Sequence, residues 1–329
     1  MPRTLDAQHD RFPLNHPFRI ARGTKTAADV VTVTIRDGGA VGRGEAVPYP
    51  RYGETVASAL AAIEQVRPLI ERSGGRAELA GALPAGAARN ALDCALWDLE
   101  ARLSGRSVAE AIGRPLPSTV ATALTVVIDT PEAMAKAAAA LAHVPVLKVK
   151  VDAQDPAAQI RAVRAAAPDP VLIVDPNESW DRALLEAIQP LLLEVRAALL
   201  EQPVPAGDDA WLEDFSPAVP ICADEAVHVA ADLPLVARRY QAVNVKLDKA
   251  GGLTAALELA EAARARGLGL MTGCMVSSSL SIAPALHVAA LSDFVDLDGP
   301  AWLREDRPGG VTIESGIIRP PAAGFWGMA

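Results

Sequence analysis

Residues 146–178 are VLKVKVDAQDPAAQIRAVRAAAPDPVLIVDPNE, and this stretch decides the fold. Val146–Val151 and Val171–Asp175 are short runs rich in β-branched residues, which are typical of buried strands. Pro156–Ala167 between them is rich in Ala and Arg and favours a helix. Both strands end in ionisable residues, although strands of a buried parallel sheet are usually apolar. The stretch predicts a strand–helix–strand unit with polar groups at its strand ends.

The same unit recurs through the chain from residue 118. Strand-like runs end about every 25 residues, and Ala-, Leu- and Arg-rich stretches separate them. Eight runs with seven helical connections predict an α/β fold, a (β/α)₇β TIM-like barrel. A doubly wound open sheet is the alternative, but GxGxxG follows none of the runs. The predicted strands are Ala121–Ile128, Val146–Val151, Val171–Asp175, Ala198–Glu201, Pro220–Ala223, Ala242–Leu247, Gly269–Gly273 and Val295–Asp298.

The first third of the chain has a different pattern. Val30–Ile35 alternates like a strand, a turn signal follows at residues 37–39, and Val41–Val47 can return as a second strand. A helix is predicted within Ala87–Leu103, and its apolar face consists of Leu92, Leu96, Leu99 and Leu103. We expect residues 1–117 to form an α+β domain, completed by residues 300–329, and residues 118–299 to form the barrel.

Composition excludes several classes of protein. Half of the 329 residues are hydrophobic and 22% are charged, so the chain is not disordered. The net charge of −9 argues against a nucleic-acid partner. No apolar run is long enough to cross a membrane, and Met1–Leu14 has no secretory pattern. Three scattered cysteines form no disulfide framework or CxxC site. We therefore expect a cytoplasmic protein.

Three carboxylates end consecutive strands, namely Asp175, Glu201 and Asp224. Neighbouring strands lie about 4.8 Å apart, so these carboxylates would repel one another strongly. A hard divalent cation resolves that repulsion, and a site made only of oxygen ligands suits Mg²⁺. The alternative is that each carboxylate caps the helix that follows its strand. Three carboxylates in register favour one Mg²⁺ per subunit.

Lysine is rare in this chain, and four of its six lysines occur in two short motifs. Lys148 and Lys150 share one face of their strand, where two close ammonium groups would lower the pKa of at least one. Lys246 lies on the strand opposite in a closed eight-stranded barrel. Two lysines facing each other across a metal site suit removal of a proton from one face of a carbon and its return to the other. Lys249 is interpreted as structural.

Two further strand ends contribute polar or small groups. Asp296 and Asp298 are two residues apart, and a carboxylate pair can bind a substrate ammonium group; helix caps or solvated charges are the alternatives. Gly273-Cys274-Met275 ends the seventh strand and is interpreted as a wall of the substrate site. Cys274 is not expected to be a nucleophile, because no His lies in a matching motif.

These residues resemble the muconate-lactonizing subgroup of the enolase superfamily over essentially the whole chain. In the first third, Pro17-Phe18-Arg19-Ile20-Ala21-Arg22-Gly23 and Pro48-Tyr49-Pro50-Arg51-Tyr52-Gly53-Glu54 agree with that subgroup. The Asp296-Leu297-Asp298 motif, with residues 83–93 and 246–249, resembles the dipeptide epimerases, and most closely those that act on L-Ala-D/L-Glu. One departure is Pro176, where a small residue is more usual and the loop could shift.

The resemblance implies an isomerase that epimerises a murein dipeptide by 1,1-proton transfer through an enediolate. Asp175, Glu201 and Asp224 would bind Mg²⁺, Lys150 and Lys246 would be the acid and base, and Lys148 would assist. Asp296 and Asp298 would hold the dipeptide ammonium. Loops of the first domain would cap the barrel, and Arg22, Lys25 and Arg51 are candidates to bind the glutamate side chain. The partner is thus a small molecule, and a homo-oligomer is compatible with it.

Other activities remain as alternatives. The same site could serve a dipeptide epimerase of other specificity, an N-acylamino acid racemase, an o-succinylbenzoate synthase or a muconate cycloisomerase. Substrates of the last three lack the free ammonium that Asp296 and Asp298 would bind. A metal-free lyase using Lys150 or Lys246 as a Schiff base is a second class, and a non-catalytic binding barrel is a third.

Overall fold

The N-terminal part of the chain is built on a three-stranded antiparallel sheet. The structure is a computed structural model that describes residues 2–328. Strands β1 (Thr4–Ile20), β2 (Gly23–Asp37) and β3 (Ala40–Ala46) pair in that order. Both strands predicted in this part exist, and β2 is longer than predicted.

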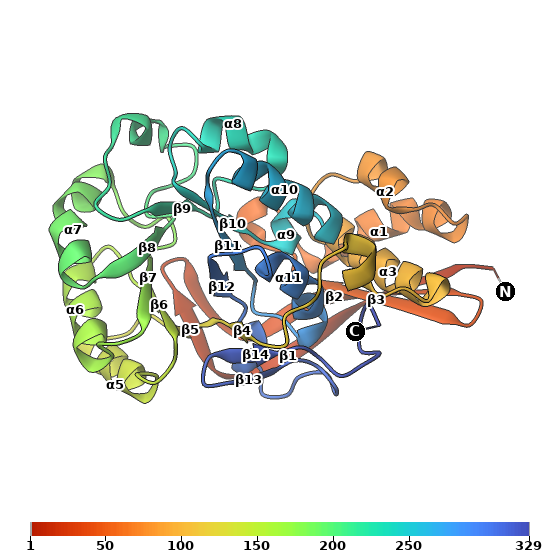
Figure 1. Ribbon diagram of the computed structural model, residues 1–329, viewed down its shortest axis with the longest axis horizontal. Helices are drawn as coiled ribbons and strands as arrows, with labels where there is room; N and C mark the ends of the chain where they lie inside the picture. The colour runs from red at the N-terminus through yellow and green to blue at the C-terminus, as the bar shows by residue number, and fades with distance from the viewer. Residues whose placement is uncertain (1, 329) are drawn as a thin grey trace.

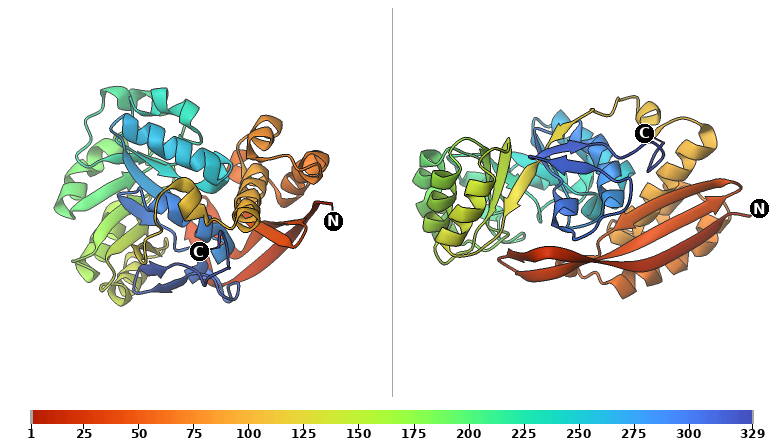
Figure 2. Two further views of the ribbon diagram at one scale, coloured as in Figure 1. Left: turned by 45° about the vertical axis from the view of Figure 1, so that its right-hand side comes forward. Right: turned by 90° about the horizontal axis from the view of Figure 1, so that it is seen from below.

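The sequence pattern does not predict strand β1. This strand forms the sheet edge beside β2, so many of its side chains are polar and exposed. Its Leu14 also forms an isolated bridge with Leu303. The pairing of β1 with β2 shifts between Pro13 and Phe18, and an edge strand tolerates such an interruption by proline. Figure 2 shows the β1–β2 hairpin extending from the N-terminal helices toward the barrel strands.

Helices α1 (Val56–Glu71) and α3 (Ala87–Ser104) pack on one face of this sheet (Figure 1). The other helical elements of this part are η1 (Pro50–Tyr52), α2 (Arg76–Ala82) and α4 (Val108–Ile112). The predicted helix at 87–103 is confirmed. Three leucines of its predicted face are buried, but Leu103, in the last turn, is 52% exposed. A Cβ at Gly44 would lie 2.1 Å from the Ala91 carbonyl oxygen, so glycine lets α3 pack closely on β3.

Most of the remaining chain forms a parallel barrel, so the predicted fold class is confirmed. Its strands neighbour each other in strict chain order, whereas a doubly wound sheet reverses its order. They are β5 (Ala123–Val126), β6 (Val146–Lys150), β7 (Val171–Asp175), β8 (Ala197–Glu201), β9 (Ile221–Ala223), β10 (Ala242–Val245), β11 (Gly269–Gly273) and β12 (Phe294–Asp296).

Helices connect the strands on the outside of the barrel (Figure 1). They are α5 (Pro131–Ala140), α6 (Pro156–Ala166), α7 (Arg182–Glu194), η3 (Ala230–Asp232), α8 (Leu233–Val236), α9 (Leu247–Ala250), α10 (Leu253–Ala265) and α11 (Ser279–Ala289). The connection from β8 to β9 contains only the 3₁₀-helix η2 (Ala210–Asp214). Among the residues that the structure describes, no helix combines the length and apolar character needed to cross a membrane.

Side-chain hydrogen bonds link the first and last barrel strands. Leu297 N donates to Thr122 Oγ1 at 2.8 Å, and Thr125 N donates to Asp298 Oδ2 at 3.0 Å. Asp298 therefore joins the two edges of the sheet. It belongs to η4 (Gly299–Trp302) as the N-cap residue, so β12 is shorter than the predicted strand.

The C-terminal segment contacts both parts of the molecule. Strands β13 (Thr312–Glu314) and β14 (Ile317–Arg319) pair with β4 (Val120–Ala121), which precedes the barrel. Further on, Trp326 Nε1 donates to the carbonyls of Arg43 and Cys94 at 3.0 and 3.2 Å. The chain end thus packs against β3 and α3.

The interior of the barrel is arranged in layers. A lower layer is apolar, and six of its side chains are Ala123, Ile173, Leu199, Cys222, Ala242 and Met271. Alternate residues of a strand share a face, so the residue two positions later points inward one layer higher. These positions hold Thr125, Asp175, Glu201, Asp224, Asn244 and Gly273. The strand alternation therefore places polar groups directly above a dry core.

Candidate active site

A cavity of about 480 Å³ lies at the carboxyl ends of the barrel strands. Its wall combines the β1–β2 hairpin and residues 49–52 with residues from the barrel. The predicted catalytic and substrate-binding residues that line it are Lys148, Lys150, Lys246, Arg22, Lys25, Arg51, Cys274, Met275, Asp296 and Asp298. Of the predicted metal ligands, Asp224 also lines the cavity, whereas Asp175 and Glu201 are fully buried beneath it.

Lys148 is the most enclosed of the lysines that the barrel contributes to the cavity, and it contacts three carboxylates. Its Nζ lies 3.0 Å from Asp175 Oδ2, 2.6 Å from Glu201 Oε2 and 2.7 Å from Asp296 Oδ2. Burial would lower the pKa of Lys148, but the carboxylates outweigh it and hold this pKa well above its ordinary value. The lowered pKa expected from a lysine pair is therefore wrong for Lys148, whose close neighbours are anions.

Lys150 and Lys246 reach the cavity from opposite sides of the barrel. Three strands separate β6 from β10 on either side. Lys150 Nζ contacts Asp175 Oδ2, and Lys246 Nζ lies 2.6 Å from Asp224 Oδ2. Burial would lower the pKa of Lys246, but Asp224 and Glu201 hold it well above its ordinary value. In this arrangement each of the two lysines is paired with a different carboxylate.

Neighbouring groups hold the three carboxylates in place. Asn177 N donates to Asp175 Oδ1 at 2.8 Å, so Pro176 does not displace that carboxylate. Asn244 Nδ2 donates to Glu201 Oε1 at 2.9 Å. Lys249, which does not line the cavity, lies 2.6 Å from Asp224 Oδ1. This last contact agrees with the structural role predicted for Lys249.

The protonation of these carboxylates follows from their neighbours. Burial would raise the pKa of Asp175, but Lys150 and Lys148 lower it to about 2. Burial likewise opposes ionisation of Asp224, yet Lys246 and Lys249 hold its pKa well below the ordinary value. Glu201 has a raised pKa, because burial and the charge of Asp175 both favour its neutral form.

The carboxylate set fits a hard cation by its chemistry. The three groups come from successive strands and offer oxygen donors only, which Mg²⁺ prefers. Glu201 Oε2 is buried and accepts no well-aligned hydrogen bond, but Lys148 Nζ lies 2.6 Å from it, so a positive charge already faces this oxygen. Within residues 2–328, no three Asp, Glu, His or Cys side chains lie close enough together to bind one metal ion in this arrangement. The lysine ammonium groups instead contact these oxygens.

The alternative that these carboxylates cap helices is wrong. Helix α7 has Asp181 as its N-cap, and η2 has Asp209. The 3₁₀-helix η3, which follows Asp224, has Val229 as its N-cap. Asp175, Glu201 and Asp224 therefore point into the barrel and serve no helix start.

Asp296 and Asp298 form an anionic corner of the cavity. Asp296 Oδ2 contacts Lys148, whereas its buried Oδ1 has no hydrogen-bond donor in residues 2–328. Asp298 Oδ2 accepts from Thr125 N and from Trp302 Nε1, the latter at 3.2 Å. Burial and the charge of Asp296 raise the pKa of Asp298 to about 6. The free Oδ1 of Asp296 can accept a hydrogen bond from a cationic group in the cavity.

Arg22 and Arg51 are two of the three residues predicted to bind the glutamate side chain, and both are already paired with carboxylates of the barrel. Arg51 Nε and Nη2 lie 2.7 and 2.8 Å from the two oxygens of Glu178. Arg22 lies 3.1 Å from Glu178 Oε2 and 2.6 Å from Glu225 Oε1. Burial and Asp224 raise the pKa of Glu225 to about 7, against the effect of Arg22. These ion pairs connect the hairpin tip and residue 51 to the barrel.

Lys25 is the third candidate and has a different environment. Its Nζ lies 4.7 Å from the centre of the Tyr49 ring, and no carboxylate of residues 2–328 forms an ion pair with it. Burial lowers the pKa of Lys25, and Tyr49 and Asp248 partly oppose that shift. Of these three residues, Lys25 is therefore the one whose ammonium group is available to bind a ligand carboxylate.

Sequence reasoning assigned no role to several cavity residues. Glu225 follows a predicted ligand, and Phe18, Tyr49 and Tyr52 lie inside stretches quoted for the family resemblance. Glu178 ends the DPNE motif and pairs with both arginines. Their position at strand ends and in these motifs was the available signal. The sequence does not indicate which lysine or arginine each carboxylate contacts, because these contacts depend on the three-dimensional arrangement.

Two family models together match most of the chain. The model "Mandelate racemase / muconate lactonizing enzyme, N-terminal domain" matches residues 3–113, and "Enolase C-terminal domain-like" matches residues 132–325. The chain is 51% identical over 306 residues to the L-Ala-D/L-Glu epimerase of Escherichia coli (strain K12), covering 92% of this chain and 95% of that protein. It is 44% identical over 305 residues to an N-acetyl-D-glutamate racemase of Pseudoalteromonas sp, covering 91% and 96%.

Solved structures extend this similarity to the whole fold. An Agrobacterium tumefaciens enolase family member with homology to dipeptide epimerases, holding sodium and L-Ala-L-Glu with an ordered loop, has a TM-score of 0.96. It is 46% identical and covers 99% of this chain and 100% of its own. A dipeptide epimerase from Methylococcus capsulatus, complexed with Mg and L-Arg-D-Lys, has a TM-score of 0.86 at 35% identity and covers 98% of both chains.

Proposed function

The chain belongs to the mandelate racemase / muconate lactonizing enzyme family of the enolase superfamily, and from this we propose that it epimerises the dipeptide L-Ala-D/L-Glu. Its relatives are epimerases and racemases, and it is an isomerase of the same class, acting on amino acid derivatives. The observation that carries the proposal is one cavity with Lys150 and Lys246 on opposite sides, an anionic corner at Asp296 and Asp298, and an unpaired cation at Lys25. A zwitterionic dipeptide with an acidic side chain complements these charges.

The two lysines would transfer the proton at the α-carbon of the glutamate residue. The C–H bond breaks on one face as its proton moves to the Nζ of one lysine, which must begin neutral. The ammonium of the other lysine then delivers a proton to the opposite face, so the charge of the site is unchanged. Lys148, which contacts Asp175, Glu201 and Asp296, would add positive charge beside the reacting carbon and offset the negative charge that develops there.

We assign one Mg²⁺ per subunit to Asp175, Glu201 and Asp224. When bound there, the ion would supply Lewis-acid stabilisation to the substrate carboxylate as it becomes an enediolate. The oxygen donors support this assignment, and so does the buried Oε2 of Glu201, which already faces a positive charge. So does the Mg held by the Methylococcus relative. Asn244 and Asn177 would orient two of these ligands through the hydrogen bonds described above.

The ends of the substrate would bind at opposite walls. The alanine ammonium would donate to Asp296 Oδ1, with Asp298 supplying further negative charge. The glutamate side chain would meet Lys25, because Arg22 and Arg51 are already engaged by Glu178 and Glu225. Residues 1–117, completed by 300–329, would thus cap the site and select the substrate, while 118–299 would carry the chemistry. A dipeptide of this kind is a murein fragment, so the proposal includes a part in murein peptide metabolism.

The proposal is tested by proton NMR of L-Ala-L-Glu with the protein and Mg²⁺ in D₂O. We expect the glutamate α-proton signal to disappear and L-Ala-D-Glu resonances to grow, with both changes abolished by EDTA. Exchange that persists in EDTA, together with trapping by borohydride, would instead indicate a Schiff-base lyase. No exchange despite bound Mg²⁺ would contradict this substrate.

The second candidate is racemisation of an N-acylated glutamate, favoured by the 44% identical racemase. Such a substrate has the same side chain but a neutral acyl group in place of the ammonium. The buried free oxygen of Asp296 favours the dipeptide, because an anion facing a neutral acyl group would lack a partner. Parallel NMR assays with N-acetylglutamate decide between them: the larger kcat/KM identifies the substrate.

A further inference from the structure

Gln202 lies outside the cavity, at the point where three carboxylate-bearing segments meet. It follows Glu201 directly and is completely buried. Its backbone carbonyl accepts from Glu178 N at 2.8 Å, in the loop after β7. Its backbone N–H donates to Cys222 O at 2.9 Å, on β9. Its main chain therefore joins the ends of β7, β8 and β9.

The side chain of Gln202 adds a second link to the same region. Oε1 accepts from Asp224 N at 2.8 Å and from Ala226 N at 3.1 Å. Nε2 donates to Val204 O and to Tyr240 Oη, each at 2.9 Å. The amide thus uses two acceptor and two donor positions, which an apolar side chain lacks and a carboxylate only partly offers.

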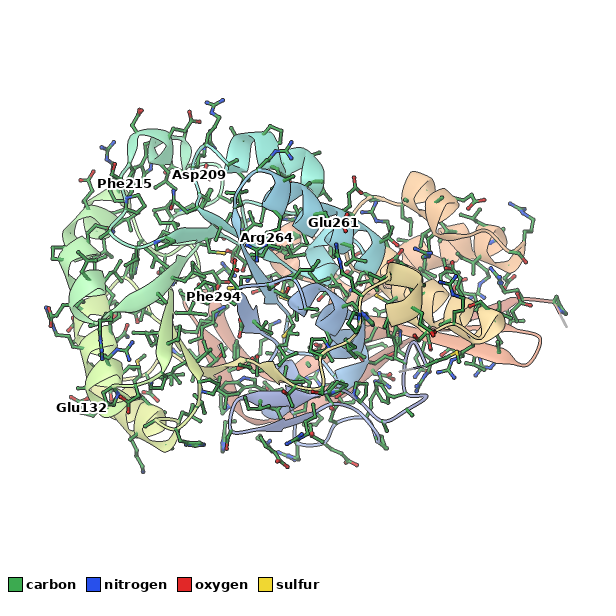
Figure 3. The ribbon with its side chains drawn as sticks, viewed as in Figure 1. Glu132, Asp209, Phe215, Glu261, Arg264 and Phe294 are labelled. Atoms are coloured by element: carbon green, nitrogen blue, oxygen red, sulfur yellow. The ribbon has the colours of Figure 1, made fainter. Side chains whose placement is uncertain are left out.

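A hydrogen-bond chain fixes which way this amide points. Tyr240 Oη donates to Asp209 Oδ2 at 2.6 Å, so its own proton is committed and it must accept from Gln202 Nε2. Arg239 in turn lies 2.8 Å from Asp209 Oδ1. Asp209 is the N-cap residue of η2, in the outer connection from β8 to β9 (Figure 3). The oxygen of the amide is thereby directed at Asp224.

The backbone of Gln202 shows that this arrangement is imposed by its surroundings. Its φ is +32°, a region that non-glycine residues seldom adopt. Such a conformation persists only where the surrounding contacts over-determine it. Here those contacts are the main-chain and side-chain hydrogen bonds of Gln202 itself.

We propose that Gln202 is a positioning residue that sets the placement of Asp224 relative to Glu201, and thereby the affinity for Mg²⁺. It touches neither the cavity nor a ligand oxygen, and it acts only through the backbone that carries Asp224. This inference rests on the metal site of the proposed function. A looser Asp224 would leave the carboxylates present but poorly arranged for a small cation that demands regular geometry.

The test is Mg²⁺ binding by isothermal titration calorimetry on the full chain carrying Gln202→Met. Methionine has similar length but cannot hold Asp224 N or Ala226 N. We expect Mg²⁺ binding about 10–100-fold weaker than in the unaltered chain, as for other groups that orient metal ligands. The matched control is Tyr240→Phe, which disturbs the same buried network. Val204 O still accepts from Gln202 Nε2 in this variant, so the amide keeps its orientation and its bonds to Asp224 N and Ala226 N. Tyr240→Phe should lower the unfolding temperature and leave Mg²⁺ affinity unchanged.

Two further variants keep the test decisive. Gln202→Glu retains an oxygen acceptor and should recover much of the affinity lost in Gln202→Met. If Gln202→Met does not fold, Gln202→Asn replaces it, because its shorter amide cannot reach Asp224 and Tyr240 together. Folded Gln202→Met or Gln202→Asn with unchanged Mg²⁺ affinity would overturn the inference, as would an equal loss in Tyr240→Phe. Metal binding is measured without dipeptide, so an unaltered chain that binds Mg²⁺ but does not epimerise would contradict the proposed function alone.

Discussion

Arg51 and Glu178 form a two-point ion pair between the cap and the barrel, with nitrogen–oxygen distances of 2.7 and 2.8 Å. Glu178 is also 3.1 Å from Arg22 and accepts from Ala206 N at 2.8 Å. A bidentate pair of this kind fixes orientation as well as charge. It places the hairpin tip and residue 51 over the cavity before any substrate is present.

Replacing Glu178 by Gln should loosen this closure. The charge is lost while the shape is kept, so Arg22 and Arg51 lose a shared partner and the loops must be ordered by the substrate. We expect KM for L-Ala-L-Glu to rise several-fold with a smaller change in kcat, measured by steady-state kinetics. Glu194→Gln is the control, because it removes an exposed ion pair with Arg161, far from the cavity. Equal kinetics in both variants would contradict the role of Glu178.

Lys25→Met should weaken recognition of the glutamate side chain. A charge-assisted hydrogen bond contributes about 1.5–3 kcal/mol, so kcat/KM for L-Ala-L-Glu should fall about 10–100-fold. Lys25→Arg should retain most of the activity, because it keeps a cation at this position. L-Ala-L-Met, which has no side-chain charge, supplies the comparison. An equal fall in kcat/KM for L-Ala-L-Met would show that Lys25 does not act by binding the glutamate side chain.

Asp296→Asn should affect a dipeptide more than an acylated amino acid. The variant removes the charge that would face the alanine ammonium and also one of three partners of Lys148. The loss of a partner of Lys148 affects both substrates equally. The ratio of their kcat/KM values therefore reports only the lost charge that faces the ammonium. We expect kcat/KM for L-Ala-L-Glu to fall at least tenfold more than that for N-acetylglutamate, consistent with a lost charged hydrogen bond of about 1.5 kcal/mol or more. A constant ratio would rule out the ammonium site.

Asp248 should make stability depend on pH. Its carboxylate accepts from Val47 N and Asn90 Nδ2 at 2.9 Å, and burial raises its pKa to about 7. The folded state therefore holds this proton in a range where the unfolded chain has released it, and stability is lost as pH rises toward 7. Asp248→Asn removes this titration. We expect the unfolding temperature of this variant minus that of the unaltered chain to increase from pH 5 to pH 8. A difference that does not change with pH would contradict the prediction.

Much of the fold could be predicted because the barrel repeats one local pattern. The strands at 171–175 and 269–273 occur with the predicted bounds, since apolar runs between helices are a clear signal. Strand β1 was missed because an edge strand need not alternate and this one contains two prolines. Leu103 fits the helical period but lies in the last turn of α3, where the neighbouring surface ends.

The sequence predicted which residues gather at the site, but not which of them form ion pairs with one another. Strand ends meet at one edge of a barrel, so Asp175 and Lys246 had to be close in space. Which groups pair was not visible: Lys148 meets three carboxylates, and its raised pKa follows from that packing. Arg22 and Lys25 looked equivalent in sequence. They are distinguished by the loops after β7 and β9, which bring Glu178 and Glu225 to Arg22.

The central claim is that Lys150 and Lys246 serve opposite faces of one carbon. The most direct measurement is α-proton exchange of L-Ala-L-Glu and of L-Ala-D-Glu in D₂O, each with Lys150→Ala and with Lys246→Ala. We predict that neither variant epimerises, that each still exchanges the proton of one isomer, and that the isomer differs between the two variants. Epimerisation at the unaltered rate in either variant, or exchange of the same isomer by both, would contradict the two-lysine mechanism.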